Sequence, residues 1–244
     1  MQPQEQVLEV WGDFACFSRP ELKVERFSYP IITPSAARGI FDAVYCKPLE
    51  FRWQITRVCC LGPPAYIALR RNEVKEKAPK ADTILAWAGG KSEPVPILAD
   101  GDRDLLRTDE KGRTQRQTMA LKNVRYRLHA RVCPWPGFEA GRAGMEAQFS
   151  RRASHGKCIY QPYFGCREFP AFFRLVEGNE PWAPAAPFAT DLGLMLYDVF
   201  DLSRPGTCDD GPSISLFRAV VRDNVMIVPP YESDAVLKGV RRQR

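Results

Sequence analysis

Two short stretches of the chain carry residue types that could act on a polyanion. In "FSRRASHGK", residues 149–157, two arginines precede one of the chain's two histidines and a glycine. Arginines suit phosphate groups and an imidazole titrates near neutral pH, so the stretch could bind a phosphodiester and move a proton on it. The alternative is a solvated helix end, because the helix dipole favours cations at a C-terminus in any case.

The second stretch is "VRYRLHARV", residues 124–132, which alternates strictly between apolar and basic side chains. The period of two predicts a half-buried strand with one basic face, which suits phosphate contacts better than core packing. The basic side chains are Arg125, Arg127, His129 and Arg131. Nine Lys and Arg residues lie between positions 103 and 131 against three acidic ones, and the alternative reading is a solvated charge run.

The chemistry open to such residues is narrow. The sequence has no Walker loop, no G-x-G-x-x-G, no G-x-S-x-G and no H-E-x-x-H motif, and its carboxylates are scattered. Two histidines and eight cysteines without zinc spacing predict no metal and no other cofactor. Tyr, Lys, Arg and His side chains can still cleave RNA through its own 2′-OH. The aromatic signature of an RRM is absent, so base stacking at the centre of a sheet is not indicated.

The sequence predicts an α+β fold for the elements that position these residues. Residues 7–17 and 49–61 are strand-like, and between them Thr33 is a candidate N-cap and Pro34 a first helical residue. Strand, helix, strand is the opening of a ferredoxin-like sandwich. Residues 71–118 are polar and interrupted by glycine and proline, which predicts extended insertions or a hairpin.

The second half of the chain predicts one helix and then strands. Residues 139–154 form the helix, with Gly156 as its natural stop. Three strand candidates follow within residues 172–177, 192–202 and 214–229, and Asp223 with Asn224 predicts a hairpin turn or bulge. We therefore expect an RRM-like domain over residues 1–168 and a small antiparallel sheet domain with a basic tail over residues 169–244.

Composition agrees with a protein of the cytoplasm. The 244 residues carry a net charge of +6, which weakly favours a polyanionic partner. No apolar run has the length of a membrane span, and the first residues lack the order of a secretory signal. The cysteines are expected to be free and mostly buried, and no membrane partner is expected.

Four longer stretches resemble a known family: "ITPSAARGIFDAVYCKPLEFRWQI", "IALRRNEVKEK", "RTQRQTMALKNVRYRLHA" and "FSRRASHGKCIYQPYFGCREFPAFF". Together, over about residues 7–229, they are similar to the CRISPR-associated RAMP endoribonuclease of type I-C systems, of the Dvulg subtype. The resemblance implies a modified ferredoxin-like (RRM-like) domain followed by a small antiparallel sheet. It also implies metal-independent cleavage of the repeat hairpin of precursor CRISPR RNA. The product would stay bound through its repeat-derived tag, together with the other subunits of the type I-C surveillance complex.

The resemblance assigns the site residue by residue. The family's Y-x-K-P tyrosine matches Tyr45 in "VYCKP", whereas the family's Lys-His pair on the second helix falls on Gly144 and Met145, which cannot move protons. His155 is then the nearest titratable replacement, and its alternative is a solvent-facing histidine. Tyr45 has its own alternative as a core tyrosine at a helix end. The predicted catalytic residues are Tyr45 and His155, and the predicted RNA contacts are Lys47, Arg116, Arg125, Arg127, His129, Arg131, Arg151, Arg152 and Arg167.

Two other functions stay open at this stage. Without the Lys-His pair, the chain could be a non-catalytic RNA-binding scaffold that holds the tag end of a mature guide. A weaker alternative is nonspecific binding of duplex DNA, which some members of the family show. In the "GCREF" stretch we expect a glycine turn near bound RNA, with Arg167 paired to Glu168 or to phosphate.

Overall fold

The computed structural model describes residues 4–22, 24–97, 99, 111–178, 180–206 and 211–239. Contacts divide the chain into two compact units, one of Met1–Ile67 with Met119–Arg244 and one of Ala68–Thr118. The predicted boundary at 168/169 does not coincide with this division, and a separate domain over residues 169–244 stays a prediction. Arg103 and Arg107 of the basic run and the basic tail beyond Gly239 lie outside the described residues.

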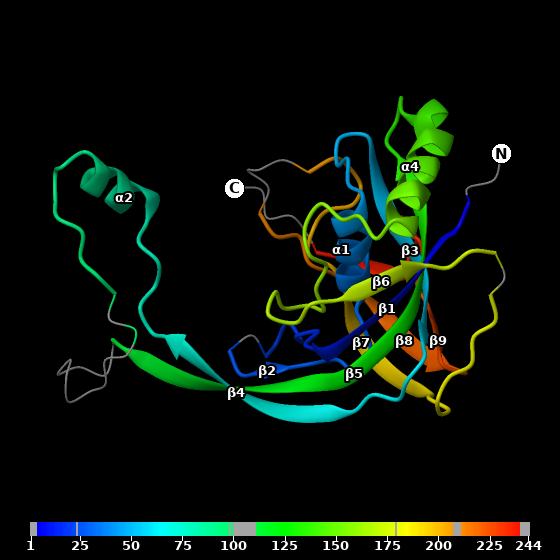
Figure 1. Ribbon diagram of the computed structural model, residues 1–244, viewed down its shortest axis with the longest axis horizontal. Coiled ribbons are helices and arrows are strands. Elements are labelled where there is room, and N and C mark those ends of the chain that lie inside the picture. Colours follow the sequence, from blue (N-terminus) through cyan, green and yellow to red (C-terminus); the bar gives the residue numbers. More distant parts are fainter. Residues whose placement is uncertain are drawn as a thin grey trace. The chain divides into compact units, whose positions relative to one another are not determined.

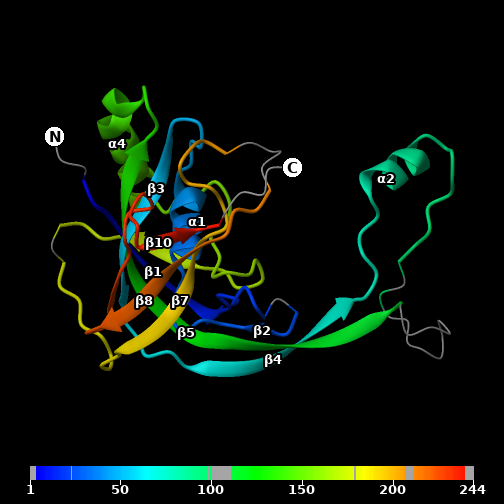
Figure 2. The same cartoon turned by 180° about the vertical axis from the view of Figure 1, so that it is seen from behind.

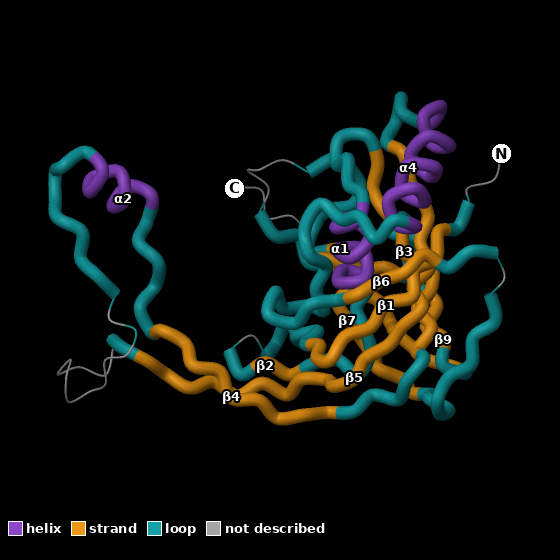
Figure 3. Tube along the Cα trace, in the orientation of Figure 1, coloured by secondary structure: helices purple, strands orange, loops and turns teal. Residues whose placement is uncertain are grey.

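The first unit is built on antiparallel strands. β1 (Gln6–Ala15) pairs with β5 (Arg113–Pro134), and β5 pairs on its other side with β3 (Phe51–Cys60). The short strands β2 (Arg26–Phe27) and β6 (Phe172–Leu175) pair with β5 and β1. The predicted α+β class is confirmed in its coarse form, a mostly antiparallel sheet with few helices (Figure 3).

The C-terminal strands join this sheet. β7 (Thr190–Asp198) pairs with β8 (Ser215–Arg222), and β9 (Val225–Ile227) pairs with both β8 and β3. β10 (Val236–Lys238) borders β8, as Figure 2 shows from behind. Asp223 and Asn224 have φ of 48° and 66°, which confirms the predicted hairpin turn. The first of the three expected C-terminal strands differs, because β6 pairs with β1 and not with β7.

Two helices cover one face of the sheet (Figure 1). α1 (Pro34–Val44) packs on β3, and α4 (Arg142–Ser154), preceded by the 3-10 turn η1 (Glu139–Gly141), packs on β6 and on α1. Phe41 of α1 and Phe149 of α4 meet Trp53 of β3 with ring centroids 5.0 and 4.7 Å from the indole. Burial of these large rings contributes about 1.5–3 kcal/mol each and fixes both helices against the strand.

The second unit contains a helix that the sequence pattern did not predict. It holds most of β4 (Tyr66–Val74), α2 (Ala81–Ala88) and the beginning of β5. β4 pairs with β5, as the hairpin prediction required. No side chain of α2 is buried within the described structure, and Lys80 at its N-cap makes no side-chain cap. The sequence of α2 therefore has neither a buried apolar stripe nor a capping residue from which the helix could be predicted.

The described cysteines are all free thiols, as expected, and Cys16, Cys59, Cys60 and Cys166 are buried. Cys208 lies outside the described residues. Among the helices described, none combines the length and the apolar character needed to cross a membrane.

Candidate functional site

The C-terminal end of α1 holds Tyr45 in a fixed place. The Thr33 hydroxyl caps the helix by accepting from Ala36 N at 3.2 Å, and Pro34 begins it, as predicted. At the other end Tyr45 is the C-cap, its N–H donates to the Phe41 carbonyl, and its own carbonyl accepts from the Trp53 indole at 2.9 Å. The Tyr45 ring is 9% exposed and lies 5.5 Å from Phe51, centroid to centroid. Tyr45 is thus a core residue, and the packing of its ring also fixes the position of its hydroxyl group.

Lys47 places an ammonium group beside this tyrosine. Its Nζ donates to Glu50 at 2.8 Å, and the side chain is about half exposed. The pKa of Lys47 lies above its usual value, first because Glu50 hydrogen-bonds the ammonium and second because the Tyr45 side chain interacts with it. A cation and a phenol therefore lie together at the end of α1.

The C-terminal end of α4 carries the Arg-Arg-His motif. The helix stops where predicted, at Gly156 with φ +63°, and His155 is its C-cap. Gly156 N donates to Ala153 O at 3.1 Å and Lys157 N to Arg152 O at 2.9 Å, which is the Schellman pattern. Arg151 and Arg152 occupy the last turn, where the helix dipole favours cations.

The two helix ends meet. Arg152 Nε donates to the Val44 carbonyl at 2.6 Å, and Ile159 N donates to the Ala43 carbonyl at 2.6 Å. The chain leaving α4 therefore lies along the last turn of α1, one residue before Tyr45. The structure thus brings the Arg-Arg-His motif to the same end of the unit as Tyr45 and Lys47.

His155 is exposed, and its contacts bear on its tautomer. Nδ1 lies 2.8 Å from the Arg151 carbonyl and 3.1 Å from the Ser154 hydroxyl. A proton on Nδ1 satisfies the carbonyl, which leaves Nε2 as the lone-pair nitrogen of the neutral ring. Such a nitrogen can accept a proton.

Gly144 and Met145, which the resemblance matches to the family's Lys-His pair, differ in their surroundings. A Cβ added at Gly144 meets nothing within 4 Å, and Gly144 is exposed. Met145 is 6% exposed and belongs to the core side of α4. A side chain at 144 would thus reach solvent, whereas one at 145 replaces core packing.

Carboxylates and neighbouring segments cover part of the basic face of β5. The predicted alternation is confirmed, but Arg127 is 4% and His129 6% exposed. Arg127 donates to Glu9 at 3.2 Å and to the Glu180 carbonyl at 2.6 Å, while His129 Nδ1 lies 3.1 Å from Glu5. A phosphate contact by either residue stays a prediction and would compete with these carboxylates. Of the four, Arg125 and Arg131 are exposed.

Glu9 of β1 is the centre of this arrangement, and the motif search missed it. It accepts hydrogen bonds from Arg125, Arg127 and Arg174, the last from β6 at 2.8 Å. Burial would raise the pKa of the Glu9 carboxyl, but the hydrogen bonds of Arg125 and Arg127 outweigh burial, and the pKa lies below its usual value. The sequence of β1 did contain an indication of this role. Glu9 lies within an apolar strand, and a buried carboxylate requires a cationic partner.

The remaining predicted contacts lie in different places. Gly165 has φ +79°, and a Cβ there would overlap the Cys16 carbonyl, which confirms the glycine turn of "GCREF". Arg167 is exposed, but Glu168 pairs with Arg26 at 3.1 Å, so Glu168 has another partner than the one expected. Arg116 belongs to the second compact unit. Within the described ranges, no three His, Cys, Asp or Glu side chains are grouped to hold a metal ion.

Comparisons with known proteins agree with the sequence motifs. The family model described as CRISPR-associated protein (Cas_Cas5) matches residues 7–229. The chain is 37% identical over 235 residues to the CRISPR pre-crRNA endoribonuclease Cas5d of Mannheimia succiniciproducens, covering 94% of this chain and 96% of that one. It is also 37% identical over 199 residues to the protein of the same name from Thermus thermophilus, covering 82% and 75%.

A solved structure described as that of a CRISPR-associated protein shares the fold. It superposes with a TM-score of 0.61 at 18% sequence identity and covers 96% of both chains. The match of the family model to nearly the whole chain, and the identity to the two relatives, show the family to which the motifs pointed. The chain belongs to the CRISPR-associated Cas5 family.

Proposed function

We propose that the protein is an endoribonuclease that cleaves the repeat hairpin of precursor CRISPR RNA. The observation that carries the proposal is the 37% identity, over 94% of the chain, to a relative named as a CRISPR pre-crRNA endoribonuclease. The meeting of Tyr45, Lys47 and the Arg-Arg-His helix end supports it, because these groups suit RNA cleavage.

The proposed reaction uses the RNA's own 2′-OH and no metal. The 2′-OH of the nucleotide 5′ of the scissile phosphate gives its proton to a base, and its oxygen attacks phosphorus. The bond from phosphorus to the 5′ oxygen of the next nucleotide breaks, and that oxygen takes a proton from an acid. The products are a 2′,3′-cyclic phosphate and a 5′-hydroxyl.

The residues at the two helix ends would divide this work. His155 Nε2 is the proposed base, since Nδ1 faces the Arg151 carbonyl. The Tyr45 hydroxyl is the proposed donor to the leaving oxygen. The Lys47 ammonium would stabilise the charge that develops on the phosphate oxygens, and the exposed Arg151 guanidinium would bind the RNA backbone. Arg152 would position Tyr45 through the Val44 carbonyl and contact the RNA with its other N–H groups.

The exposed cations extend the proposed RNA path beyond the site. Arg131 and Arg125 on β5 and Arg167 after α4 are exposed and suited to phosphates. After cleavage the protein would keep the repeat-derived tag and join the other subunits of the type I-C interference complex. We include in this proposal the ferredoxin-like layout that the family resemblance implies for the first part of the chain, and the cytoplasmic location that the composition favours.

A second candidate function is a non-catalytic scaffold that binds the tag, or duplex DNA nonspecifically. Gly144 and Met145 favour it, because a glycine and a buried methionine stand where the family carries proton-transfer groups. The two functions share the RNA-binding surface and differ in whether the bond is cut.

The test is incubation of the purified protein with its own repeat hairpin, in EDTA and in Mg²⁺, with matched hairpins that are all-ribo or carry one 2′-deoxy nucleotide before the scissile phosphate. We expect cleavage of the first and none of the second. Binding without cleavage of either would favour the scaffold. Equal cleavage of both would contradict the 2′-OH mechanism, and loss of activity in EDTA would contradict metal independence.

A further inference from the structure

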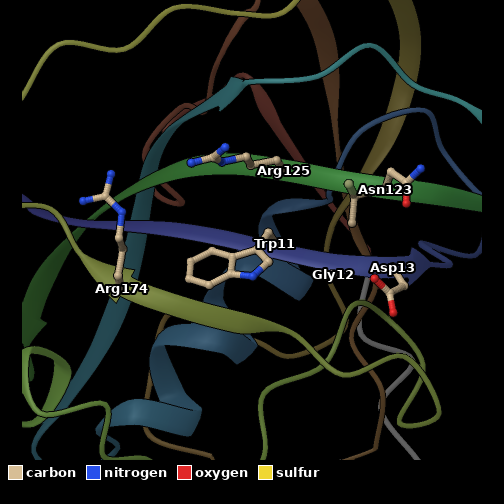
Figure 4. Close-up of a pocket in the computed structure, with 7 residues that line it drawn as sticks. Trp11, Gly12, Asp13, Asn123, Arg125 and Arg174 are labelled. Atoms are coloured by element: carbon tan, nitrogen blue, oxygen red, sulfur yellow. The ribbon is translucent and has the colours of Figure 1, made fainter.

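A second surface with features of a nucleic-acid site lies on the face of the sheet turned away from the helices. It is a cavity of about 490 Å³, here called the Trp11 pocket (Figure 4). Its lining residues are Trp11, Gly12, Asp13, Asn123, Val124, Arg125 and Arg174. The volume is within the range of small-ligand sites, about 300–1,000 Å³.

The pocket is assembled by strand register. Trp11 of β1 lies opposite Arg125 of β5 on one side and Phe172 of β6 on the other. Leu8 and Val10, which alternate with Glu9 and Trp11, are fully buried on the other face. The pocket therefore gathers residues from three strands that are distant in sequence.

Trp11 is the aromatic ring of the lining, and it stacks on a second exposed ring, Phe172, which lies outside the lining. Trp11 is 38% and Phe172 51% exposed, and their rings stack with centroids 6.4 Å apart and planes 27° from parallel. Exposed aromatics on a sheet face, flanked by cations, are the arrangement on which single-stranded nucleic acids stack their bases.

Arg125 and Arg174 offer guanidinium N–H groups to a phosphate in the pocket. Arg125, Arg127 and Arg174 surround Glu9, and Arg174 also pairs with Glu180 at 2.5 Å, so three guanidinium groups face two carboxylates. Asp13 also lines the pocket, so three carboxylates balance the three guanidinium charges. A phosphate would be bound through the N–H groups that remain available, because a guanidinium with five N–H groups can bind a carboxylate and a phosphate together. Glu9 thereby holds two arginines in place beside Trp11.

Polar groups for a base edge lie on the other side of the ring. In Figure 4, Trp11 lies between Arg174 and the pair of Asp13 and Asn123. The Asp13 carboxylate accepts hydrogen bonds, and the Asn123 amide both donates and accepts. The negative charge of Asp13 directs a phosphate toward the arginines and leaves its own side for the exocyclic amino groups of a base.

The Trp11 pocket is separate from the site at Tyr45. Trp11 pairs with Arg125, whereas Phe51, which packs against Tyr45, pairs with Pro134. Nine residues of strand, about 30 Å, separate these two positions of β5. A nucleotide in the pocket would therefore belong to a part of the RNA remote from the scissile bond.

We propose that the Trp11 pocket binds one unpaired nucleotide that flanks the repeat hairpin, with its base stacked on Trp11 and its phosphate held by Arg125 and Arg174. The inference rests on the proposed function, because it takes the RNA to be the ligand. It adds a contact to single-stranded RNA outside the hairpin.

The test compares Trp11→Ala, Trp11→Phe and wild type on two RNAs, the hairpin with its unpaired flanks and the hairpin trimmed of them. Base stacking on an aromatic ring predicts a loss of about 5- to 140-fold for Trp11→Ala on the flanked RNA, a smaller loss for Trp11→Phe, and little change on the trimmed RNA. Ile227→Ala is the control, because Ile227 is 65% exposed and lies in β9 of the same sheet. Thermal melting checks that each variant is folded.

Three outcomes would overturn the pocket assignment. One is unchanged affinity of Trp11→Ala for the flanked RNA, and another is an equal loss on both RNAs. The third is unchanged RNA binding with loss of copurifying complex subunits, which would assign the aromatic rings to a protein partner.

A fluorescence titration separates this inference from the proposed function. A single-stranded cytidine 12-mer, whose bases carry an exocyclic amino group, should quench the emission of wild type and not of Trp11→Phe, whatever the protein does to the hairpin. If wild type neither binds nor cuts its repeat RNA but Trp11 is quenched, the proposed function fails and the pocket stands only as a site for single-stranded RNA. If wild type cuts the hairpin and the 12-mer does not quench Trp11, only the pocket fails.

Discussion

Arg152 Nε donates a 2.6 Å hydrogen bond to the Val44 carbonyl, and so fixes the end of α4 to the residue before Tyr45. A charge-assisted hydrogen bond of this kind is short and directional. The packing of the two helices, and not a surface loop, therefore sets the distance between the Arg-Arg-His motif and the Tyr45 phenol.

The hydroxyl of Tyr45 is the first group to test. Tyr45→Phe keeps the ring on Phe51 and the backbone contacts, so we expect a folded protein with unchanged hairpin affinity. The cleavage rate should fall about 10²- to 10⁴-fold, the usual contribution of a proton-transfer group. Single-turnover rates with labelled hairpin measure this. Tyr66→Phe, which also removes a hydrogen-bonded hydroxyl, is the control and should cut normally. Normal cutting by Tyr45→Phe would remove Tyr45 from the site.

Arg151 and Arg152 are neighbours with different expected roles. Arg152→Met removes the bond to Val44 and should lower the single-turnover rate by up to about 10²-fold, because small misplacements of reacting groups are costly. Arg151 is exposed and bonds Gln148, so Arg151→Met should weaken RNA binding and leave the rate at saturating RNA nearly unchanged. Each of the two variants is the control for the other, because both remove one arginine from the last turn of α4. Identical effects on binding and rate in both variants would contradict the positioning role of Arg152.

The glycine and methionine on α4 offer a gain-of-function test. Gly144→Lys meets open space and replaces a poor helix former, so it should raise stability by about 0.5–1 kcal/mol and supply the missing cation. Met145→His buries an imidazole and should cost about 1–3 kcal/mol. We expect faster cleavage from Gly144→Lys and a further gain from the double variant if it remains folded. Gly39→Lys, at an equally open helical glycine of α1, controls for added charge. Equal rates for Gly144→Lys and Gly39→Lys would show that position 144 has no special role.

The sequence predicted what local signals specify. Thr33 and Pro34 marked the start of α1, Gly156 the end of α4, and Asp223 with Asn224 the hairpin turn, because each of these effects acts within a few residues. The alternation of residues 124–132 also predicted the strand and its two faces correctly.

What lies across the sheet could not be predicted in this way. Glu9 binds Arg127 across 118 positions of sequence and Arg174 across 165, and nothing in "VRYRLHARV" shows which strands will lie beside it. The basic face was therefore expected to be open, whereas carboxylates of β1 and of the segment after β6 occupy its centre. The Trp11–Phe172 pair was missed for the same reason, since it exists only through the register of β1 with β6.

Arg127, which is buried beside carboxylates, and Arg131, which is exposed, should differ in how their mutation changes stability and RNA binding. Arg131→Ala removes an exposed cation, so we expect stability within about 0.5 kcal/mol of wild type and a salt dependence of RNA binding shallower by about one ion. Arg127→Ala removes a partner of the buried Glu9 and should instead cost about 1–3 kcal/mol of stability. Urea unfolding and plots of log Kd against log salt measure the two effects. A stable Arg127→Ala protein with a shallower salt slope would show that Arg127 contacts phosphate after all.

His129 should make the fold sensitive to acid. It is buried beside Glu5, Arg57 and Cys59, and burial, with the charge of Arg57, lowers its pKa to about 4 from a usual 6.5. Between these values the unfolded chain binds a proton that the folded protein does not, so stability is full above about pH 6.5 and falls as the pH drops toward 4. The shift corresponds to about 3 kcal/mol over that window. Urea midpoints at several pH values should show the loss in wild type and a weaker pH dependence in His129→Gln. His155→Gln is the matched control, because the chain has two histidines and His155 is exposed. A His129→Gln protein with the full pH dependence of wild type would show that another group senses the acid.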